Sequence, residues 1–433
     1  MLKAQLYLKL SALIPNEAER FAIAFSGGGD STALVYALKD HPQCAAVLIV
    51  DHALRRGSAK EALGARQFAQ SLGHDTHILQ WSHDNPKSGI QEKARRARYG
   101  LMGEFCRKNK ISHLLTAHHQ DDQAETLLMR YDRHTDWRGA AGMAEYYYGA
   151  LWPELAGVGL YRPLLAVSRA DLLGYNQKNN LKWAEDPSNQ NRDYARIRAR
   201  EYLDTHTPLK DHLLTAAKDL SYGLSKERHL FQRDLGTADI GYAGEIVFPK
   251  FPPLELLAHA MRCVGGSGGV IERDRLGRLY QSFKSGDVKG FTYLGAQTLR
   301  HQEGLLICRD KVAVLGRKDR GGAPQASKVA LTKSPKVWDG RFLASSKRSG
   351  YELCANYDLK IPRSKRLQAL MSAANKSVRP CMPVIIHQNM AFSIDERPEI
   401  EVKCLARERL ESLTRNLTPL KGCLLYTSPS PRD

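Results

Sequence analysis

The chain lacks several patterns that would assign it to common protein classes. Its eight cysteines include no C-x-x-C pair, which argues against a zinc ribbon, an iron–sulfur site or a disulfide scaffold and favours a reducing, cytoplasmic setting. No apolar run approaches about 18 residues, so no membrane span is expected. Lys3, Lys9 and Glu17 interrupt the apolar positions of residues 1–20, which therefore predict an amphipathic helix rather than a signal peptide.

Acidic residues are scarce relative to basic ones. The 46 Asp and Glu residues face 64 Lys and Arg residues, and the formal net charge is +18. Such an excess favours a polyanionic partner such as a nucleic acid, although a merely basic, well-solvated surface is the alternative.

A glycine-rich turn follows the apolar run that ends at Phe25. It reads Ser26, Gly27, Gly28, Gly29, Asp30 and Ser31. Glycines let several backbone N–H groups approach one anion, and the serine hydroxyls and the start of a helix add further donors. The turn is neither a Walker loop nor a dinucleotide fingerprint, and a turn without a ligand is the alternative. Because an aspartate repels phosphate unless a cation lies between them, Asp30 predicts a bridging Mg²⁺.

Strand-like and helix-like segments alternate in the first part of the chain. The strands are expected at 22–25, 45–51, 75–80 and 113–117, with helices at 32–39, 58–72 and 90–108 between them. This βαβ alternation predicts an α/β fold with a doubly wound parallel sheet and ligands at the carboxyl ends of its strands. The phosphate-binding turn, the pair Asp51 and His52, and the segment 118–122 all fall at such ends.

Charged residues after the fourth strand form a second candidate group. The string TAHHQDDQAET contains His118, and a helix would place Asp122 and Glu125 on one face, where they can hold a cation or an ammonium group. Acidic residues are also common in the first turn of a helix for its dipole alone. Arg55, after the second strand, either stabilises phosphate charge or is a solvated arginine at a helix start.

A basic segment follows an Asp-Pro-Ser-Asn turn near residue 186. Its helix-like pattern presents a surface suited to a phosphate backbone, formed by Arg192, Arg196, Arg198 and Arg200.

Six motifs in a fixed order resemble the tRNA(Ile)-lysidine synthetase family of PP-loop ATP pyrophosphatases. They are SGGGDS, VDHALR, GIQEKARRARY, TAHHQDDQAET, RPLL and EDPSN, and they cover Phe21 to about Arg200. Two departures are a missing Arg-Gly-Ser-Gly turn in 130–143 and Arg196-Ile197 in place of Arg-Asn.

The resemblance implies ATP-dependent ligation of L-lysine to carbon 2 of the wobble cytidine of a CAU-anticodon tRNA(Ile), with release of AMP and pyrophosphate. It implies that the turn 26–31 binds ATP, with Asp30 on Mg²⁺. Asp51, His52 and Arg55 would also contact ATP, whereas Asp30, His118, Asp122 and Glu125 would be catalytic. Within the same fold, a tRNA 2-thiolase is the alternative, and a non-catalytic RNA-binding protein is the alternative of another class.

The length of 433 residues predicts about two or three domains. We expect a catalytic domain at 1–210, a middle tRNA-recognition region at 211–323 and a small C-terminal domain at 324–422. Residues 132–159 are expected to form a long loop over the site, 321–338 a linker or exposed loop, and 304–309 and 384–387 short strands. Residues 423–433 resemble a translated sequencing adapter. If so, the natural sequence is interrupted at about residue 422.

Overall fold

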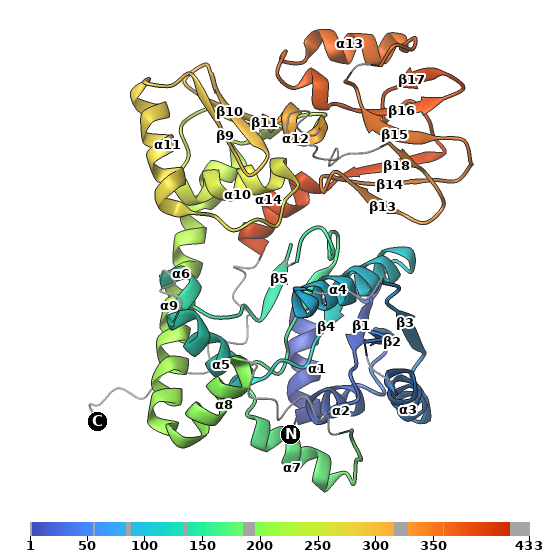
Figure 1. The fold of residues 1–433 in the computed structure, drawn as a ribbon, viewed down its shortest axis with the longest axis vertical. Helices are drawn as coiled ribbons and strands as arrows, with labels where there is room; N and C mark the ends of the chain where they lie inside the picture. Colours follow the sequence, from blue (N-terminus) through green and yellow to red (C-terminus); the bar gives the residue numbers. More distant parts are fainter. Residues whose placement is uncertain are drawn as a thin grey trace. The chain divides into compact units, whose positions relative to one another are not determined.

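A computed structural model describes residues 2–54, 57–83, 88–132, 137–149, 151–184, 195–315, 328–357 and 359–415. Within these residues the chain forms two compact units (Figure 1). The first contains Met1–Ala150 and Val158–His229, and the second contains Leu151–Gly157 and Leu230–Thr414. Helix α9 (Thr207–Gly236) runs through both the boundary between the units and the expected boundary at 210/211, so the three-domain division of the sequence remains a prediction.

The first unit is built on a six-stranded sheet with the order β3-β2-β1-β4-β6-β5. Its strands are β1 (Phe21–Ala24), β2 (Cys44–Asp51), β3 (Thr76–Gln80), β4 (His113–Leu115), β5 (Tyr146–Tyr148) and β6 (Gly159–Tyr161). All neighbours pair in parallel except β5 with β6. Most apolar side chains of the central strands are buried, as is usual in a parallel sheet covered on both faces. The predicted α/β class and doubly wound sheet are therefore confirmed.

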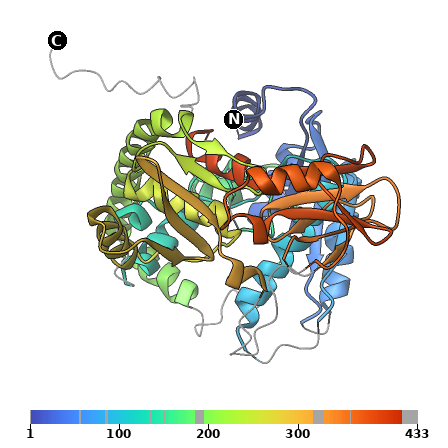
Figure 2. The ribbon, with the colours of Figure 1, turned by 90° about the horizontal axis from the view of Figure 1, so that it is seen from above.

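Helices cover this sheet on both sides. In Figure 1 the strands lie between α4 (Ile90–Lys108) on one side and α2 (Gly29–Ala37) and α3 (Ser58–Ser71) on the other; Figure 2 gives a second view. The amphipathic helix expected at the start of the chain is α1 (Leu2–Leu13), which buries Leu2, Leu6 and Leu10 at every fourth position. Helical spacing of apolar residues thus predicted these helices within a few residues.

The segment expected to be a long loop contains regular structure. Helix α6 (Trp137–Ala140) and strand β5 lie within it, and β5 extends the sheet by pairing antiparallel with β6. The expectation of an irregular loop was wrong for these residues. Three consecutive tyrosines, Tyr146–Tyr148, have high strand propensity, but the glycines and charges around them concealed it.

The remaining helices of the first unit carry or frame the candidate site. They are α5 (Gln120–Tyr131), α7 (Arg169–Lys178) and α8 (Ala195–Thr205), together with the first part of α9. None of the helices in the described ranges is long and apolar enough to cross a bilayer.

The second unit contains three smaller sheets. One has the order β7-β8-β11-β10-β9 and comprises β7 (Asp239–Ile240), β8 (Ile246–Phe248), β9 (Gly290–Tyr293), β10 (Ala296–His301) and β11 (Gly304–Arg309). Helices α10 (Leu254–Gly265) and α11 (Arg273–Ser285) share its apolar core. Strand β11 confirms the strand expected at 304–309.

The other two sheets lie in the last third of the chain. One is β12 (Val329–Ala330), β15 (Glu352–Ala355), β16 (Pro383–His387) and β17 (Met390–Phe392); the other is β13 (Lys336–Trp338), β14 (Phe342–Ser346) and β18 (Ile400–Cys404). Helices α12 (Lys311–Leu315), α13 (Lys365–Ala373) and α14 (Leu405–Arg415) accompany them. Strand β16 confirms the strand expected near 384–387.

The linker expected at 321–338 is wrong in its second part. Residues 321–327 lie outside the described ranges, but β12 and β13 fall within 328–338 and Trp338 is only 3% exposed. The lysines and the proline of this segment are uncommon in strands, so the sequence pattern did not predict these two short strands.

Candidate functional site

The glycine-rich turn joins β1 to α2 at the carboxyl end of the central strand. Gly27 has a φ of +82°, a left-handed conformation that favours glycine. The Ser31 hydroxyl donates to the carbonyl of Gly28 at 2.9 Å, and the backbone N–H of Ser26 donates to Ser31 Oγ at 3.3 Å. The N-cap residue of α2 is Gly28, which has no side chain to cap the helix, so N–H groups of its first turn can face an anion.

Helix α7 and the chain that follows it pack against this turn. Asn176 Nδ2 donates to the carbonyl of Gly29 at 2.8 Å, and the backbone N–H of Ala184 donates to the carbonyl of Gly27 at 2.9 Å. A Cβ added at Gly29 would lie 3.4 Å from Trp183 Nε1. These contacts fix the conformation of the turn, and no sequence pattern had identified Asn176 or Trp183.

The acidic helix α5 begins where β4 ends. His119 is its N-cap: the backbone N–H of His119 donates to Asp122 Oδ2 at 3.0 Å, and the ring Nδ1 accepts from the backbone N–H of Asp122 at 3.4 Å. This reciprocal capping fixes the first turn of the helix. Asp122 and Glu125 then face the same side of α5, as the sequence predicted.

His119 connects the acidic helix to the phosphate-binding turn. Its Nε2 lies 3.5 Å from Asp30 Oδ2 and 3.6 Å from Asp122 Oδ2, and its Nδ1 lies 3.7 Å from Asp121 Oδ2. Burial lowers the pKa of His119, but the bond to Asp30 and the three carboxylate charges outweigh it, so the pKa is raised. Burial raises the pKa of Asp30, but the same bond together with the positive charges of Arg169 and Arg200 outweighs it, so the pKa of that carboxyl is lowered. Two separate sequence motifs thus meet in one charged cluster.

The neighbouring histidine has the opposite electrostatic character. His118 Nδ1 lies 2.9 Å from Thr116 Oγ1. Burial, together with the positive charges of Arg162 and Arg196, holds the pKa of His118 well below its usual range. His118 is therefore neutral near pH 7, whereas the carboxylates around His119 favour its protonated form. The sequence analysis had singled out His118 and had not assigned a role to His119.

Two arginines of α8 neutralise the acidic pair. Arg196 donates from Nε to Glu125 Oε2 and from Nη2 to Asp122 Oδ1, both at 2.6 Å, and Arg200 donates from Nε to Glu125 Oε1 at 2.6 Å. Glu125 is only 1% exposed, so these bonds compensate a buried charge. Burial raises the pKa of Asp122 more than His119 and Arg196 lower it.

These ion pairs bear on the expected RNA-binding residues. A phosphate would have to compete with buried carboxylates for Arg196 and Arg200, whereas Arg198 points to an exposed side of α8. The role of Arg196, Arg198 and Arg200 in RNA binding remains a prediction. Arg192 lies outside the described residues.

The residues expected after the second strand lie at its carboxyl end. Asp51 Oδ1 accepts from the backbone N–H of Ala53 at 2.9 Å, which stabilises the turn after β2. Burial lowers the pKa of His52, and its Nδ1 is buried without a hydrogen-bond partner among the described residues. That nitrogen is a polar atom for which a ligand can supply the partner. Arg55 lies outside the described residues.

Neither a metal cluster nor a reactive thiol is found among the described residues. They contain no group of three or more His, Cys, Asp or Glu side chains suited to a metal ion. All seven described cysteines are buried or partly buried, and burial raises the pKa of Cys44 and Cys106 to about 12. Such thiols are poor nucleophiles, which argues against sulfur transfer by these cysteines.

Comparisons with known proteins find several that resemble this chain. Residues 2–206 match a model of the PP-loop domain. A protein of Wolbachia pipientis named tRNA(Ile)-lysidine synthase is 31% identical over 341 residues, which cover 74% of this chain and 75% of that protein. One of Ruegeria pomeroyi with the same name is 32% identical, over 78% of this chain and 82% of the relative. A solved U34-tRNA thiolase of Methanococcus maripaludis aligns with 51% of this chain and 79% of its own at 17% identity and a TM-score of 0.42.

Proposed function

The chain belongs to the tRNA(Ile)-lysidine synthase family, an ATP-using family of PP-loop enzymes, and we propose how its site makes lysidine. The reaction joins L-lysine to carbon 2 of the wobble cytidine of a tRNA(Ile) with a CAU anticodon. The observation that supports this most is the position of His119 between Asp30 and Asp122. It means that a phosphate cradle and a cation-binding carboxylate pair share one site.

The phosphate-binding turn would hold the departing end of ATP. We propose that backbone N–H groups at the start of α2 and the Ser26 hydroxyl bind the phosphate, while Ser31 holds the turn through its bonds to Gly28 and Ser26. Asp30 would ligate Mg²⁺ together with phosphate oxygens and water, because Mg²⁺ commonly takes only one or two protein carboxylates in nucleotide sites. The ion would neutralise the pyrophosphate that leaves. Asp51 and His52 remain proposed ATP contacts.

The carboxylates of α5 would orient the substrate lysine. Asp122 and Glu125 already bind a cationic group, the guanidinium of Arg196, which supports the proposal that a cation binds here. The neighbouring Asp121 accepts from the ammonium of Lys210, so a lysine side chain is also a suitable partner on this helix. We propose that the substrate ammonium shares these carboxylates with Arg196 or displaces it.

The chemistry proceeds in two steps. The cytidine carbonyl oxygen at carbon 2 attacks the α-phosphate, and pyrophosphate leaves. The lysine ε-amine, once deprotonated, then attacks carbon 2, and AMP takes the oxygen away. We propose that His118, which stays neutral, lies near the reacting phosphate, whereas His119 holds Asp30 and Asp122 in position.

The tRNA would contact the basic surface of α8 and the second unit. Arg198 is exposed on α8, and the whole chain has a charge of +18, which favours a polyanionic substrate. We propose that residues 211–323 help to select the tRNA. A tRNA substrate also implies that the protein acts in the cytoplasm.

One incorporation assay tests this function. The protein is incubated with ATP, Mg²⁺, labelled lysine and total tRNA, and label is measured in the RNA together with AMP. We expect label in RNA only when ATP is present, with one AMP formed per lysine incorporated. ATP consumption without label in RNA would contradict the proposal.

A further inference from the structure

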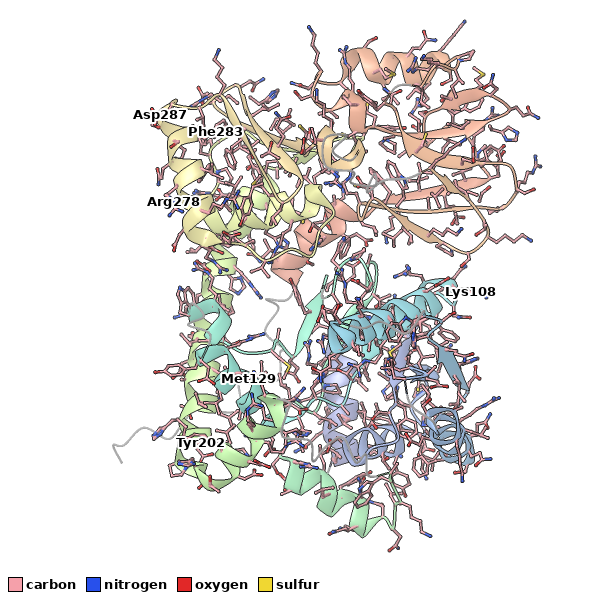
Figure 3. All side chains as sticks on the ribbon, in the orientation of Figure 1. Lys108, Met129, Tyr202, Arg278, Phe283 and Asp287 are labelled. Carbon is pink, nitrogen blue, oxygen red and sulfur yellow. The ribbon has the colours of Figure 1, made fainter. Side chains whose placement is uncertain are left out.

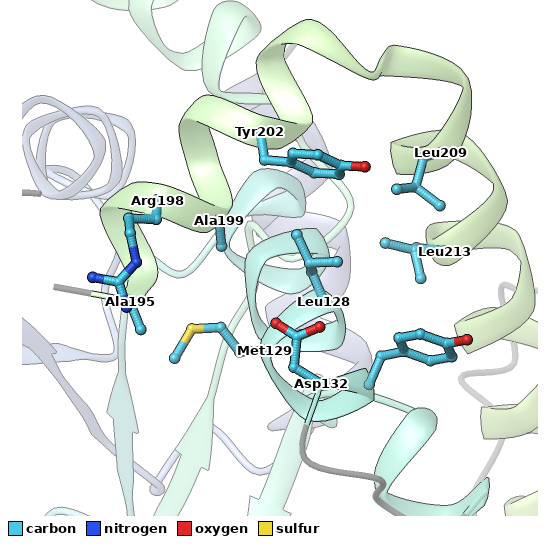
Figure 4. Close-up of a pocket in the computed structure, with 10 residues that line it drawn as sticks. Leu128, Met129, Asp132, Ala195, Arg198, Ala199, Tyr202, Leu209 and Leu213 are labelled. Carbon is cyan, nitrogen blue, oxygen red and sulfur yellow. The ribbon is translucent and has the colours of Figure 1, made fainter.

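A pocket of about 730 Å³ opens between α5, α8 and α9 of the first unit. Met129 and Tyr202 mark its position in Figure 3, and Figure 4 shows its walls. Leu128, Met129 and Leu213 supply apolar contacts, whereas Tyr202, Arg198 and Asp132 supply an aromatic ring and two opposite charges. Its volume falls in the range of small-ligand sites. The proposed ligation chemistry uses none of these side chains.

Of the two tyrosines that line this pocket, Tyr131 and Tyr202, the second is exposed and yet held in position. Tyr202 is 47% exposed, and its ring stacks on His206 with the centroids 4.0 Å apart and the planes 13° apart. His206 Nδ1 lies 2.9 Å from both Thr205 Oγ1 and the carbonyl of Tyr202, which fixes the stack. An oriented, exposed aromatic ring beside apolar side chains is the usual platform for an unstacked nucleobase.

The charges at the rim suit a base better than a bare phosphate. The Asp132 carboxylate can accept from the N–H groups on the edge of a base, whereas it would repel a phosphate placed in the pocket. Arg198 also lines the pocket and lies on the basic helix α8, where it can contact the phosphate that carries such a base. The pocket therefore suits a flat group with N–H donors that is attached to a polyanion.

The pocket lies one helical turn from the acidic pair. On α5, Leu128 follows Glu125 by three residues, or about 5 Å along the axis. On α8, Arg196 and Arg200 bind the carboxylates, whereas Arg198 and Tyr202 line the pocket. A strand that places one nucleotide at the acidic pair can thus bring an adjacent nucleotide to the pocket.

We propose that this pocket holds the unstacked base of a nucleotide that flanks the modified cytidine in the anticodon loop. The inference rests on the proposed function in one respect, namely that the cytidine lies at the acidic pair. It assigns to Tyr202 the stacking contact and to Asp132 the contact with the base edge. The pocket would then help to keep the loop open while the cytidine reacts.

The test is a binding comparison with anticodon stem-loop RNAs that are intact or abasic at one position. Removing a stacking ring costs roughly 5- to 150-fold in affinity. Tyr202→Ala should bind the intact RNA more weakly than the wild type by that factor. With an RNA that is abasic at one flanking position, the variant and the wild type should bind equally. Tyr202→Phe should bind like the wild type. Tyr222→Ala is the matched control, because Tyr222 is 62% exposed on α9 and lies about 13 Å beyond Leu213 along that helix.

The outcomes separate this inference from the proposed function. Equal losses for Tyr202→Ala with intact RNA and with both abasic RNAs, or no loss at all, would overturn it. If the wild type makes lysidine and the losses are equal, the pocket assignment alone is wrong. If the wild type makes no lysidine but the loss disappears with one abasic RNA, the pocket holds a base and the proposed function is wrong.

Discussion

Arg196 donates its Nε proton to Glu125 Oε2 at 2.6 Å, inside a site whose sequence motifs lie about 70 residues apart. The same guanidinium reaches Asp122, and Arg200 completes the set. Two carboxylates and two guanidinium groups therefore balance their charges within the cluster. A positively charged substrate group that enters the cluster has to compete with an arginine, which makes the strength of this pair a determinant of lysine affinity.

Changing Glu125 to Gln should weaken lysine binding selectively. The variant keeps the size of the side chain but removes one of the two charges that attract an ammonium group. We expect the KM for lysine to rise at least tenfold, with a much smaller change in the KM for ATP, since a bond to a charged group is worth about 1.5–3 kcal/mol. Steady-state kinetics with each substrate varied check this. Similar changes in both KM values would assign Glu125 to the ATP side, and the exposed Glu104→Gln on α4 is the control.

Changing Asp30 to Ala should abolish AMP formation while the protein stays folded. The variant removes the proposed Mg²⁺ ligand and the carboxylate that faces His119. Loss of one preorganised electrostatic group typically costs about 10²- to 10³-fold in rate. Asp40→Ala, at an exposed residue just beyond α2, should leave the rate unchanged. Activity of Asp30→Ala within a few-fold of the wild type would refute the assignment.

Salt dependence should distinguish Arg198 from Arg196. Each lysine or arginine that contacts a phosphate adds about 1 to the slope of log affinity for tRNA against log salt. Arg198 is exposed, so Arg198→Ala should reduce the slope by about 1. Arg196 is bound to carboxylates, so Arg196→Ala should leave the slope unchanged and instead alter the lysine KM. A reduced slope for both variants would place both arginines on phosphates.

The protonation of His119 should depend on Asp30. The folded pKa of His119 is raised above 6.5, so the charged cluster stabilises the fold fully below pH 6.5 and loses that contribution as the pH rises through the raised pKa. Asp30→Asn should lower the pKa of His119, because it removes a hydrogen-bonding carboxylate. Ring ¹⁵N shifts in histidine-labelled protein, assigned with His119→Gln, measure this. An unchanged pKa in Asp30→Asn would mean that the pair is not formed in solution.

Local patterns in the sequence were sufficient for much of the first unit. The helix expected at 90–108 has those bounds, and the strands expected near 45–51 and 75–80 differ from β2 and β3 by one residue. Spacing of apolar residues carries this information, because each helix and strand buries one repeating face. Irregular composition concealed β5, β12 and β13, each of which has only two or three residues and is ordered by pairing with another strand.

The site was predictable in its parts but not in its pairings. Asp122 and Glu125 share a face because both lie on one helix, which a sequence shows directly. Arg196 comes from a helix that begins more than 60 residues later, and its position depends on how α8 packs against α5. Side-chain partners across such distances depend on tertiary packing. The helical pattern alone therefore predicted Arg196 to be a surface residue.

Lysidine formation is tested most directly by the masses of the nucleosides in tRNA(Ile) after reaction with the protein, ATP, Mg²⁺ and lysine. We expect cytidine at the wobble position to be replaced by a nucleoside heavier by one lysine less one water, and we expect no such product with Asp30→Ala. A thiolated nucleoside, or unmodified cytidine despite ATP consumption, would contradict the assignment.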